Sequence, residues 1–169
     1  MHSDGLRLER LRLEHAPMLF AALDDPRVGH FIDGPDVTTL AALRARIDRV
    51  TDGPPPESGQ TWLNFAVLLG PTVIGRVEAT VHDGIAEIAY LIGPQWWGCG
   101  YGAAATSLLL DNLAVTGVTD YWATTMPDNL ASVGVLVHLG FSEVETRDAP
   151  LLHSYDDGDR VFHRREAAP

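Results

Sequence analysis

The glycine-rich segment at residues 95–103, with the sequence QWWGCGYGA, constrains the fold of this chain more than any other feature. Its glycines occupy alternate positions, at Gly98, Gly100 and Gly102. Because glycine has no Cβ atom, a ligand can approach such a backbone closely. An Ala/Leu-rich helix is predicted directly afterwards, and the first N–H groups of a helix lack partners within it. A glycine loop in front of a helix start therefore favours an anion, most often a phosphate group.

Several interpretations of the glycine-rich segment compete. A short Gly-x-Gly-x-Gly run on its own is most often a tight turn. A dinucleotide-binding loop needs G-x-G-x-x-G spacing in a parallel βαβ unit, whereas here the spacing differs and the preceding strands are predicted to be antiparallel. A Walker loop needs Gly-Lys-Ser/Thr, and the segment contains no lysine. The remaining interpretation is a binding loop for another kind of phosphorylated cofactor, and motifs elsewhere in the sequence support it.

Composition narrows the class of protein. The 169 residues, 46% hydrophobic and 21% charged, predict one globular domain spanning residues 1–169. No apolar run approaches the roughly 20 residues of a membrane helix, and the start of the chain has no signal-peptide pattern, so we expect a cytoplasmic protein. The net charge of −11 argues against a nucleic-acid partner. Cys99 is the only cysteine, which excludes an internal disulfide.

Hydrophobic periodicity predicts a mixed α/β order. Apolar runs at residues 62–69, 72–81 and 85–92 are separated by short turns, which predicts an antiparallel meander. Residues 53–59 form a Pro/Gly loop and the best candidate for a mobile segment. The other expected elements are strands at 6–13, 120–125, 141–146 and 160–165, and helices at 17–23, 38–50, 103–115 and 129–139, with Gly140 as a left-handed cap.

Several motifs together resemble one protein family. Residues 97–102, WGCGYG, match the pattern Trp-Gly-x-Gly-Tyr-Ala/Gly, and residues 86–94, AEIAYLIGP, match the strand and turn that precede it. Downstream, residues 129–132, NLAS, and 139–141, LGF, match an Asn-x-x-Ser … Leu-Gly-Phe run. In this order the motifs resemble the GNAT superfamily of acetyltransferases, and within it the RimJ/RimL-like branch. The resemblance covers most of the chain.

The resemblance implies both a fold and a reaction. The implied α/β (α+β) fold has a mixed, mostly antiparallel sheet of six or seven strands, splayed between the strands at 85–92 and 120–125 and flanked by about four helices. The implied reaction moves an acetyl group from acetyl-CoA to a primary amine by direct attack. The acceptor would be a protein N-terminus or a small-molecule amine. A non-catalytic acyl-CoA sensor or interaction module remains the alternative, and the protein would be a monomer or homodimer.

The resemblance also implies which residues hold acetyl-CoA. Its pyrophosphate would lie on loop N–H groups, its thioester beside the strand backbone near residue 91, and its arm near the helix at 129–139. The implied positions are Leu91, Ile92, Trp97, Gly98, Cys99, Gly100, Tyr101, Gly102, Ala103, Asn129 and Ser132. Asn129 has a structural alternative as a helix cap. The seven histidines show no local metal-ligand spacing, so no metal is expected.

The resemblance implies two catalytic side chains. Glu87 lies where several family members carry a catalytic glutamate and is the expected general base, with a structural glutamate as the equal alternative, and Glu78 is a weaker second candidate. Ser132 is the expected proton donor to the thiolate. Many relatives outside the branch use a tyrosine where this chain has Leu136. Cys99 lacks a neighbouring histidine to activate it and is interpreted as an ordinary loop residue.

The acceptor site is less well defined by the sequence. Aromatic side chains and a group of acidic residues are its candidates, the latter because carboxylates attract a protonated amine, although loop aspartates are usually solvated. These residues are Phe31, Trp62, Tyr90, Asp24, Asp25, Asp33 and Asp36.

Overall fold

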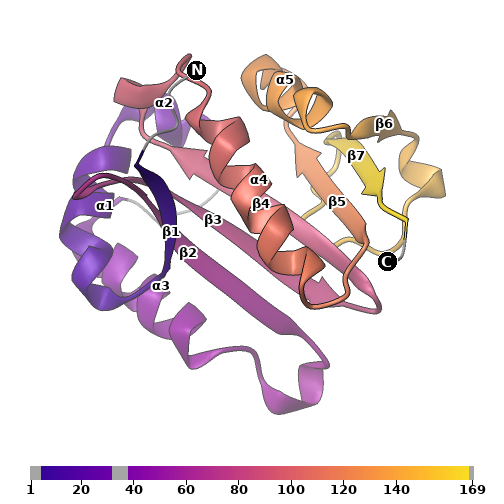
Figure 1. Cartoon of the computed structure of the whole chain (residues 1–169), viewed down its shortest axis with the longest axis horizontal. Helices are drawn as coiled ribbons and strands as arrows, with labels where there is room; N and C mark the ends of the chain where they lie inside the picture. The colour runs from indigo at the N-terminus through magenta and orange to yellow at the C-terminus, as the bar shows by residue number, and fades with distance from the viewer. Residues whose placement is uncertain (1–4, 32–37, 168–169) are drawn as a thin grey trace.

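The computed structural model describes residues 5–31 and 38–167. Seven strands form one sheet in the order β1-β2-β3-β4-β5-β7-β6 (Figure 1). The strands are β1 Leu6–Arg10, β2 Thr61–Leu69, β3 Thr72–His82, β4 Ile85–Ile92, β5 Asp120–Thr125, β6 Ser142–Val144 and β7 Arg160–Arg165. The α-helices are α1 Ala16–Leu23, α2 Pro26–Gly29, α3 Leu40–Asp52, α4 Tyr101–Ala114 and α5 Leu130–His138. The predicted mixed, mostly antiparallel sheet is confirmed.

The pairing of the central strands creates a gap in the sheet. β2, β3 and β4 form the predicted antiparallel meander. β4 and β5 run parallel but pair only at Ala86 with Tyr121 and at Glu87 with Trp122. Because no further pairs join them, the two strands diverge toward the end of β4. The predicted splay is therefore present, and it leaves the last residues of β4 without a strand on that side.

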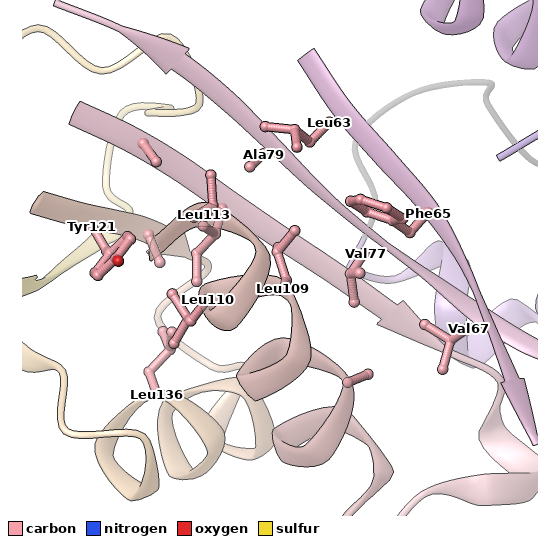
Figure 2. Packing of buried hydrophobic residues seen from close by; sticks show 14 of the residues in the cluster. Leu63, Phe65, Val67, Val77, Ala79, Leu109, Leu110, Leu113, Tyr121 and Leu136 are labelled. Carbon is pink, nitrogen blue, oxygen red and sulfur yellow. The ribbon is translucent and has the colours of Figure 1, made fainter. Parts of the chain in front are cut away.

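The two faces of the sheet carry separate hydrophobic cores. On one face, α4 and α5 cover alternating strand residues that include Phe65, Val77 and Ile88, and Leu109 and Leu113 of α4 pack among them (Figure 2). On the other face, the buried residues of α1 and α3 pack against Ala66, Leu68 and Val73 of β2 and β3, with Leu91 of β4 at the margin of this cluster. Since side chains alternate along a strand, the even-numbered residues Ile88 and Ile92 of β4 face the first core, and Leu91 faces the second.

Local signals explain where the helices begin and end. Thr39 Oγ1 accepts from Ala42 N at 3.0 Å and caps α3, and Asn129 Oδ1 accepts from Ser132 N at 3.1 Å and caps α5. Gly140 has φ 81°, which confirms the predicted left-handed end of α5. The α4 helix begins at Tyr101 rather than at residue 103. Gly100 is its N-cap and has a left-handed conformation, with φ 81° and ψ 1°.

Two strands are shorter than predicted, and one short helix was not predicted. β1 ends at Arg10 rather than residue 13, since its pairing with β2 stops opposite Phe65 and a 3-10 turn follows. β6 is shorter than predicted and gives way to a 3-10 turn at Thr146–Asp148. The unpredicted helix is α2, which Asp25 caps and Pro26 begins. No helix among the described residues is long and apolar enough to span a membrane.

Candidate active site

Two adjoining cavities lie around the gap between β4 and β5. The first, here called the glycine-loop cavity, has a volume of about 830 Å³ and is lined by residues 96–104, the end of β4 and one face of α5. The second, here called the polar cavity, has a volume of about 780 Å³ and is lined by side chains of α3, β3, β4, β5 and the loop at residues 154–159. Both volumes suit a ligand of small-molecule size. The two linings share Phe31, Tyr90, Leu91, Asn129 and Ser132.

The glycine-loop cavity presents backbone rather than charged side chains. Gly98 and Gly100 have φ angles of 72° and 81°, a left-handed conformation that other residues rarely adopt. A Cβ atom added at Gly98 would meet no atom within 4 Å, so the space beside the loop is open. Gly100 is the N-cap of α4 and has no side chain with which to cap it. The first N–H groups of the helix therefore remain available to an anion.

All the positions predicted to hold acetyl-CoA line this one cavity. They come from the end of β4, the glycine loop, the first turn of α4 and the start of α5: Leu91, Ile92, Trp97, Gly98, Cys99, Gly100, Tyr101, Gly102, Ala103, Asn129 and Ser132. Cys99 is exposed. The indole of Trp97 donates to Ile92 O at 2.6 Å, which fixes the loop to the end of the strand.

The backbone of β4 offers polar groups to the gap. Gly93 N donates to Ile74 O at 2.8 Å, so at this end of the strand odd-numbered residues hydrogen-bond to β3. Alternation along the strand then directs the N–H of Leu91 toward β3 and the N–H groups of Tyr90 and Ile92 toward the gap. Of Leu91 and Ile92, the two strand positions implied to hold acetyl-CoA, Ile92 is the one whose N–H faces the gap.

Tyr90 and Ser132 meet where the two cavities join. The Tyr90 hydroxyl lies 2.7 Å from Ser132 Oγ and donates to Ser132 O at 3.1 Å. Burial raises the pKa of Tyr90 to about 12, against the opposing effect of its hydrogen bond with Ser132. The phenol therefore keeps its proton at neutral pH and can share it with the serine hydroxyl. Asn129 positions the same serine through its bond to Ser132 N.

An ionic cluster forms one wall of the polar cavity. The Glu78 carboxylate accepts from Arg46 Nη2 at 2.9 and 3.2 Å and from Arg76 Nη1. Both arginines are buried, and the Glu78 side chain is 25% exposed. Burial alone would raise the pKa of Glu78, but the guanidinium groups of Arg76 and Arg46 hold it below its usual value. Glu78 is therefore ionised at neutral pH and faces the cavity as an anion.

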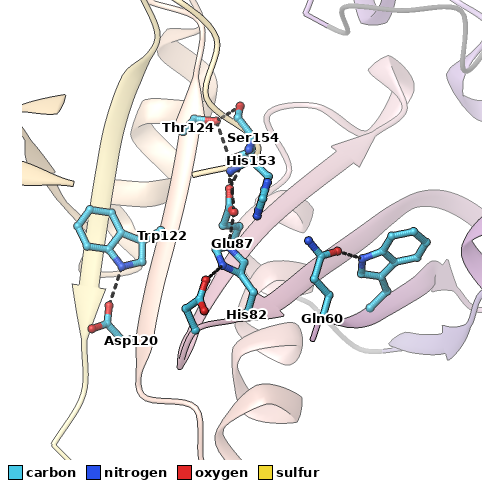
Figure 3. Close-up of polar contacts among 10 residues, drawn as sticks. Gln60, His82, Glu87, Asp120, Trp122, Thr124, His153 and Ser154 are labelled. Carbon is cyan, nitrogen blue, oxygen red and sulfur yellow. Dashed lines mark hydrogen bonds and ion pairs between the residues drawn. The ribbon is translucent and has the colours of Figure 1, made fainter. Parts of the chain in front are cut away.

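Glu87, the expected base, lies in a different environment (Figure 3). Its carboxylate contacts His82 Nε2 at 2.6 Å and accepts from His153 N at 2.9 Å, Ser154 N at 2.9 Å and Ser154 Oγ at 2.6 Å. It is 5% exposed and does not belong to the described lining of either cavity. Burial would raise the pKa of Glu87, but these hydrogen bonds, led by Ser154, lower it. This geometry favours the structural alternative, an anchor for the loop, over a base.

Only some of the residues predicted to form the acceptor site line a cavity. Phe31 lines both cavities, as does Tyr90. Among the described residues that line the two cavities, Trp62 is absent. Its indole donates to Gln60 Oε1. Asp25 caps α2 and pairs with Arg27, whose hydrogen bond lowers the pKa of Asp25 to about 2. Asp24 follows α1 at its C-cap. Asp33 and Asp36 lie outside the described residues.

Several residues of the polar cavity were not found from the sequence. The two arginines and the loop at residues 154–159, with Ser154, Asp156 and Asp159, come from distant parts of the chain. No local motif marks them, because only the folded sheet brings them together. Leu136, which occupies the position of the family tyrosine, is buried at 1% exposure among the core residues and also borders this cavity.

Comparison with known proteins identifies the family. The family model of the acetyltransferase (GNAT) domain matches residues 5–142. The chain therefore belongs to the GNAT acetyltransferases, which are acyltransferases, and the resemblance found in the sequence is confirmed.

Individual relatives agree with this assignment. Uncharacterized N-acetyltransferase p20 of Bacillus licheniformis is 27% identical over 149 residues, which cover 85% of this chain and 82% of the relative. The RimL ribosomal L7/L12 α-N-protein acetyltransferase, solved with coenzyme A, has a TM-score of 0.80 at 18% identity, covering 96% of this chain and 95% of that one. The microcin C7 self-immunity acetyltransferase MccE, solved with acetyl-CoA and AMP, has a TM-score of 0.76 at 17% identity, covering 97% and 94%. At these identities, the two structures show a shared fold.

Proposed function

We propose that this protein transfers the acetyl group of acetyl-CoA to a primary amine, with acetyl-CoA in the glycine-loop cavity and the amine in the polar cavity. The observation that carries the proposal is the meeting of the two cavities at Tyr90 and Ser132, beside the open edge of β4. The complexes of RimL with coenzyme A and of MccE with acetyl-CoA support the choice of cosubstrate.

The glycine-loop cavity fits the proposed cosubstrate. The left-handed glycines, the open space beside Gly98 and the uncapped start of α4 suit a pyrophosphate group. We assign contacts with the remainder of the molecule to the exposed edge of β4 and to Asn129 and Ser132 of the α5 start. When bound, acetyl-CoA supplies an acetyl thioester that is open to attack by an amine.

We assign proton transfer to groups that line the polar cavity and to Tyr90 and Ser132, where the two cavities meet. Asp156, Asp157 and Asp159 line the polar cavity and would attract the protonated amine, and Glu78, whose charge is offset by Arg46 and Arg76, would accept a hydrogen bond from it. Water in the cavity would accept the proton that the amine must lose. The N–H of Ile92 faces the gap and would stabilise negative charge on the thioester oxygen. Ser132, with Tyr90 holding its hydroxyl in place, would relay to the leaving thiolate the second proton that the amine nitrogen loses as the amide forms.

The amine acceptor itself is proposed only by class. A protein N-terminus and a small-molecule amine both fit a cavity of this size, whose lining includes Asp156, Asp157 and Asp159. Likeness of fold does not choose between them, because a fold supports many substrates.

The test is thiol release from acetyl-CoA by the purified protein with amines of both classes. A peptide with a free N-terminus, the same peptide with a blocked N-terminus and a set of small diamines form the panel. We expect release only with free amines, together with one added acetyl group on the amine by mass spectrometry. Acetyl-CoA binding without thiol release for any amine would contradict the proposal. It would favour the alternative, a non-catalytic acyl-CoA sensor or interaction module.

A further inference from the structure

A cluster of possible metal ligands lies outside both cavities. His82 at the end of β3, Glu87 near the start of β4 and His153 in the loop before β7 each offer one ligand atom, and these atoms lie within 4.8 Å of one another. The imidazole rings of His82 and His153 are 4.6 Å apart at an angle of 69°. Figure 3 shows both rings beside the Glu87 carboxylate. Residues from three segments thus converge on one point.

The hydrogen bonds around the cluster orient its ligand atoms. His82 Nδ1 lies 3.0 Å from Asp83 Oδ2, and His82 Nε2 lies 2.6 Å from Glu87 Oε1, so each ring nitrogen faces a carboxylate oxygen. A proton bridges Nε2 and Glu87 in the metal-free protein, and a metal ion would take its place. A carboxylate behind a ligating histidine is the usual outer partner in metal sites.

We propose that His82, Glu87 and His153 form a binding site for a divalent transition-metal ion of the zinc class. Two imidazole nitrogens and one carboxylate oxygen suit Zn²⁺ rather than Ca²⁺ or Mg²⁺, which prefer oxygen ligands. His153 is exposed, so a water molecule can take the fourth position. A tetrahedral ion with bonds of about 2.1 Å separates its ligand atoms by about 3.4 Å, so His82 and Glu87 would move apart slightly.

Metal binding here would act on the polar cavity. Glu87 already accepts from the backbone N–H groups of His153 and Ser154, and Ser154 lines that cavity together with Asp156 and Asp159. An ion held by His153 would add a bond between this loop and the β3–β4 turn. It would therefore restrain one wall of the cavity. The site stands on its own residues and does not depend on the proposed acetyl transfer.

The experiment is a titration of Zn²⁺ into chelator-treated protein, followed by calorimetry and by thermal unfolding. His153→Ala removes the exposed ligand but keeps the backbone N–H that binds Glu87. His30→Ala is the matched control, since His30 is an exposed histidine paired with a single carboxylate, Asp128, at 3.1 Å. We expect one Zn²⁺ per chain, a higher Tm, and a loss of affinity of at least about tenfold in His153→Ala alone.

Two further readouts locate the ion. Co²⁺, a spectroscopic substitute for Zn²⁺, should give visible d–d bands in wild type that are absent from His153→Ala. Zn²⁺ should also slow amide exchange at residues 149–159 in wild type. Absence of saturable binding in the wild type, or equal binding by His153→Ala and wild type, would overturn the site. Binding without slower exchange would overturn its action on the loop.

Discussion

The two cavities differ in the part of the chain that builds them. Residues 91–104, one continuous stretch, supply half of the residues that line the glycine-loop cavity, and residues 129–139 supply most of the others. The glycine loop presents glycines and backbone N–H groups to this cavity. The polar cavity takes side chains from α3, β3, β5 and the loop at residues 154–159, and Arg46, Arg76 and Glu78 give it charge. Backbone geometry determines the first, and side-chain chemistry determines the second.

This difference has a functional consequence. A left-handed backbone such as that at Gly98 and Gly100 tolerates few residue types, so the glycine-loop cavity, the proposed cosubstrate site, can change little without losing its shape. Side chains in the polar cavity can be replaced while the sheet stays intact. One fold can thus keep a common acyl donor and vary the acceptor. The predictions below test whether the two ends are separable in this way.

The largest effect is expected where the two cavities meet. Replacing Ser132 with Ala removes the proposed proton donor, and kcat should fall by about 100-fold because general acid catalysis contributes about this much. KM for acetyl-CoA should change little. Ser142→Ala, at an exposed serine of β6, is the matched control and should keep full activity. An unchanged kcat in Ser132→Ala would remove Ser132 from the mechanism.

Gly93 connects β4 to the glycine loop, and a side chain there should disturb that connection. A Cβ atom at Gly93 would lie 2.4 Å from Ala22 O and 2.8 Å from the Trp96 ring. We expect Gly93→Ala to lower the free energy of unfolding by about 2 kcal/mol, since overpacking forces backbone shifts. Chemical denaturation measures this. Gly29→Ala, where an added Cβ meets nothing within 4 Å, should cost far less, and equal losses would contradict the account.

The two glutamates should separate structure from substrate binding. Glu87→Gln weakens the bonds from Ser154 and His153, so we expect a loss of about 1–2 kcal/mol in unfolding free energy with kcat nearly unchanged. Glu78→Gln should raise KM for the amine several-fold and leave KM for acetyl-CoA unchanged, and it should also lower the unfolding free energy, because it removes the carboxylate that the buried Arg46 and Arg76 both bind. Steady-state kinetics and denaturation on both variants measure the difference. A kcat loss of about 100-fold in Glu87→Gln would restore Glu87 as the base.

The smallest effect concerns acid stability. The folded-state pKa of Glu87 is below its ordinary value of 4.5, because the hydrogen bonds from Ser154 and His153 outweigh burial. The ionised carboxylate therefore stabilises the fold above that value, and this contribution is lost as pH falls below about 4.5 through the folded-state pKa. The stability difference between wild type and Glu87→Gln should shrink between pH 7 and about pH 3. A constant difference would contradict this assignment.

The same contrast explains what the sequence predicted. Strands β2 to β5 and β7, and the cap residues Asn129 and Gly140, follow from periodicity and local turn chemistry, so they were placed within one or two residues. Most of the proposed cosubstrate positions lie within residues 91–103 and belong to a recognisable motif, and Asn129 and Ser132 belong to a second one. The proposed roles of these residues remain predictions.

Other parts of the site arise only from tertiary contacts. Glu87 has the strand position expected of a base, but its environment depends on a loop more than sixty residues away, through Ser154. The contact between Tyr90 and Ser132 spans 42 residues and crosses the gap in the sheet. The histidine cluster joins His82 and His153, which no local spacing links. Single-sequence patterns carry no information on such contacts.

The most direct test of the account is a calorimetric titration of acetyl-CoA into wild type, Gly100→Trp and Gly117→Trp. Gly100 and Gly117 share a left-handed conformation, with φ 81° and 87°, so the two substitutions impose similar backbone strain. Only Gly100 lines the glycine-loop cavity as described here. We expect 1:1 binding by wild type and Gly117→Trp and its loss in folded Gly100→Trp. Undiminished binding by Gly100→Trp, or no binding by folded wild type, would contradict it.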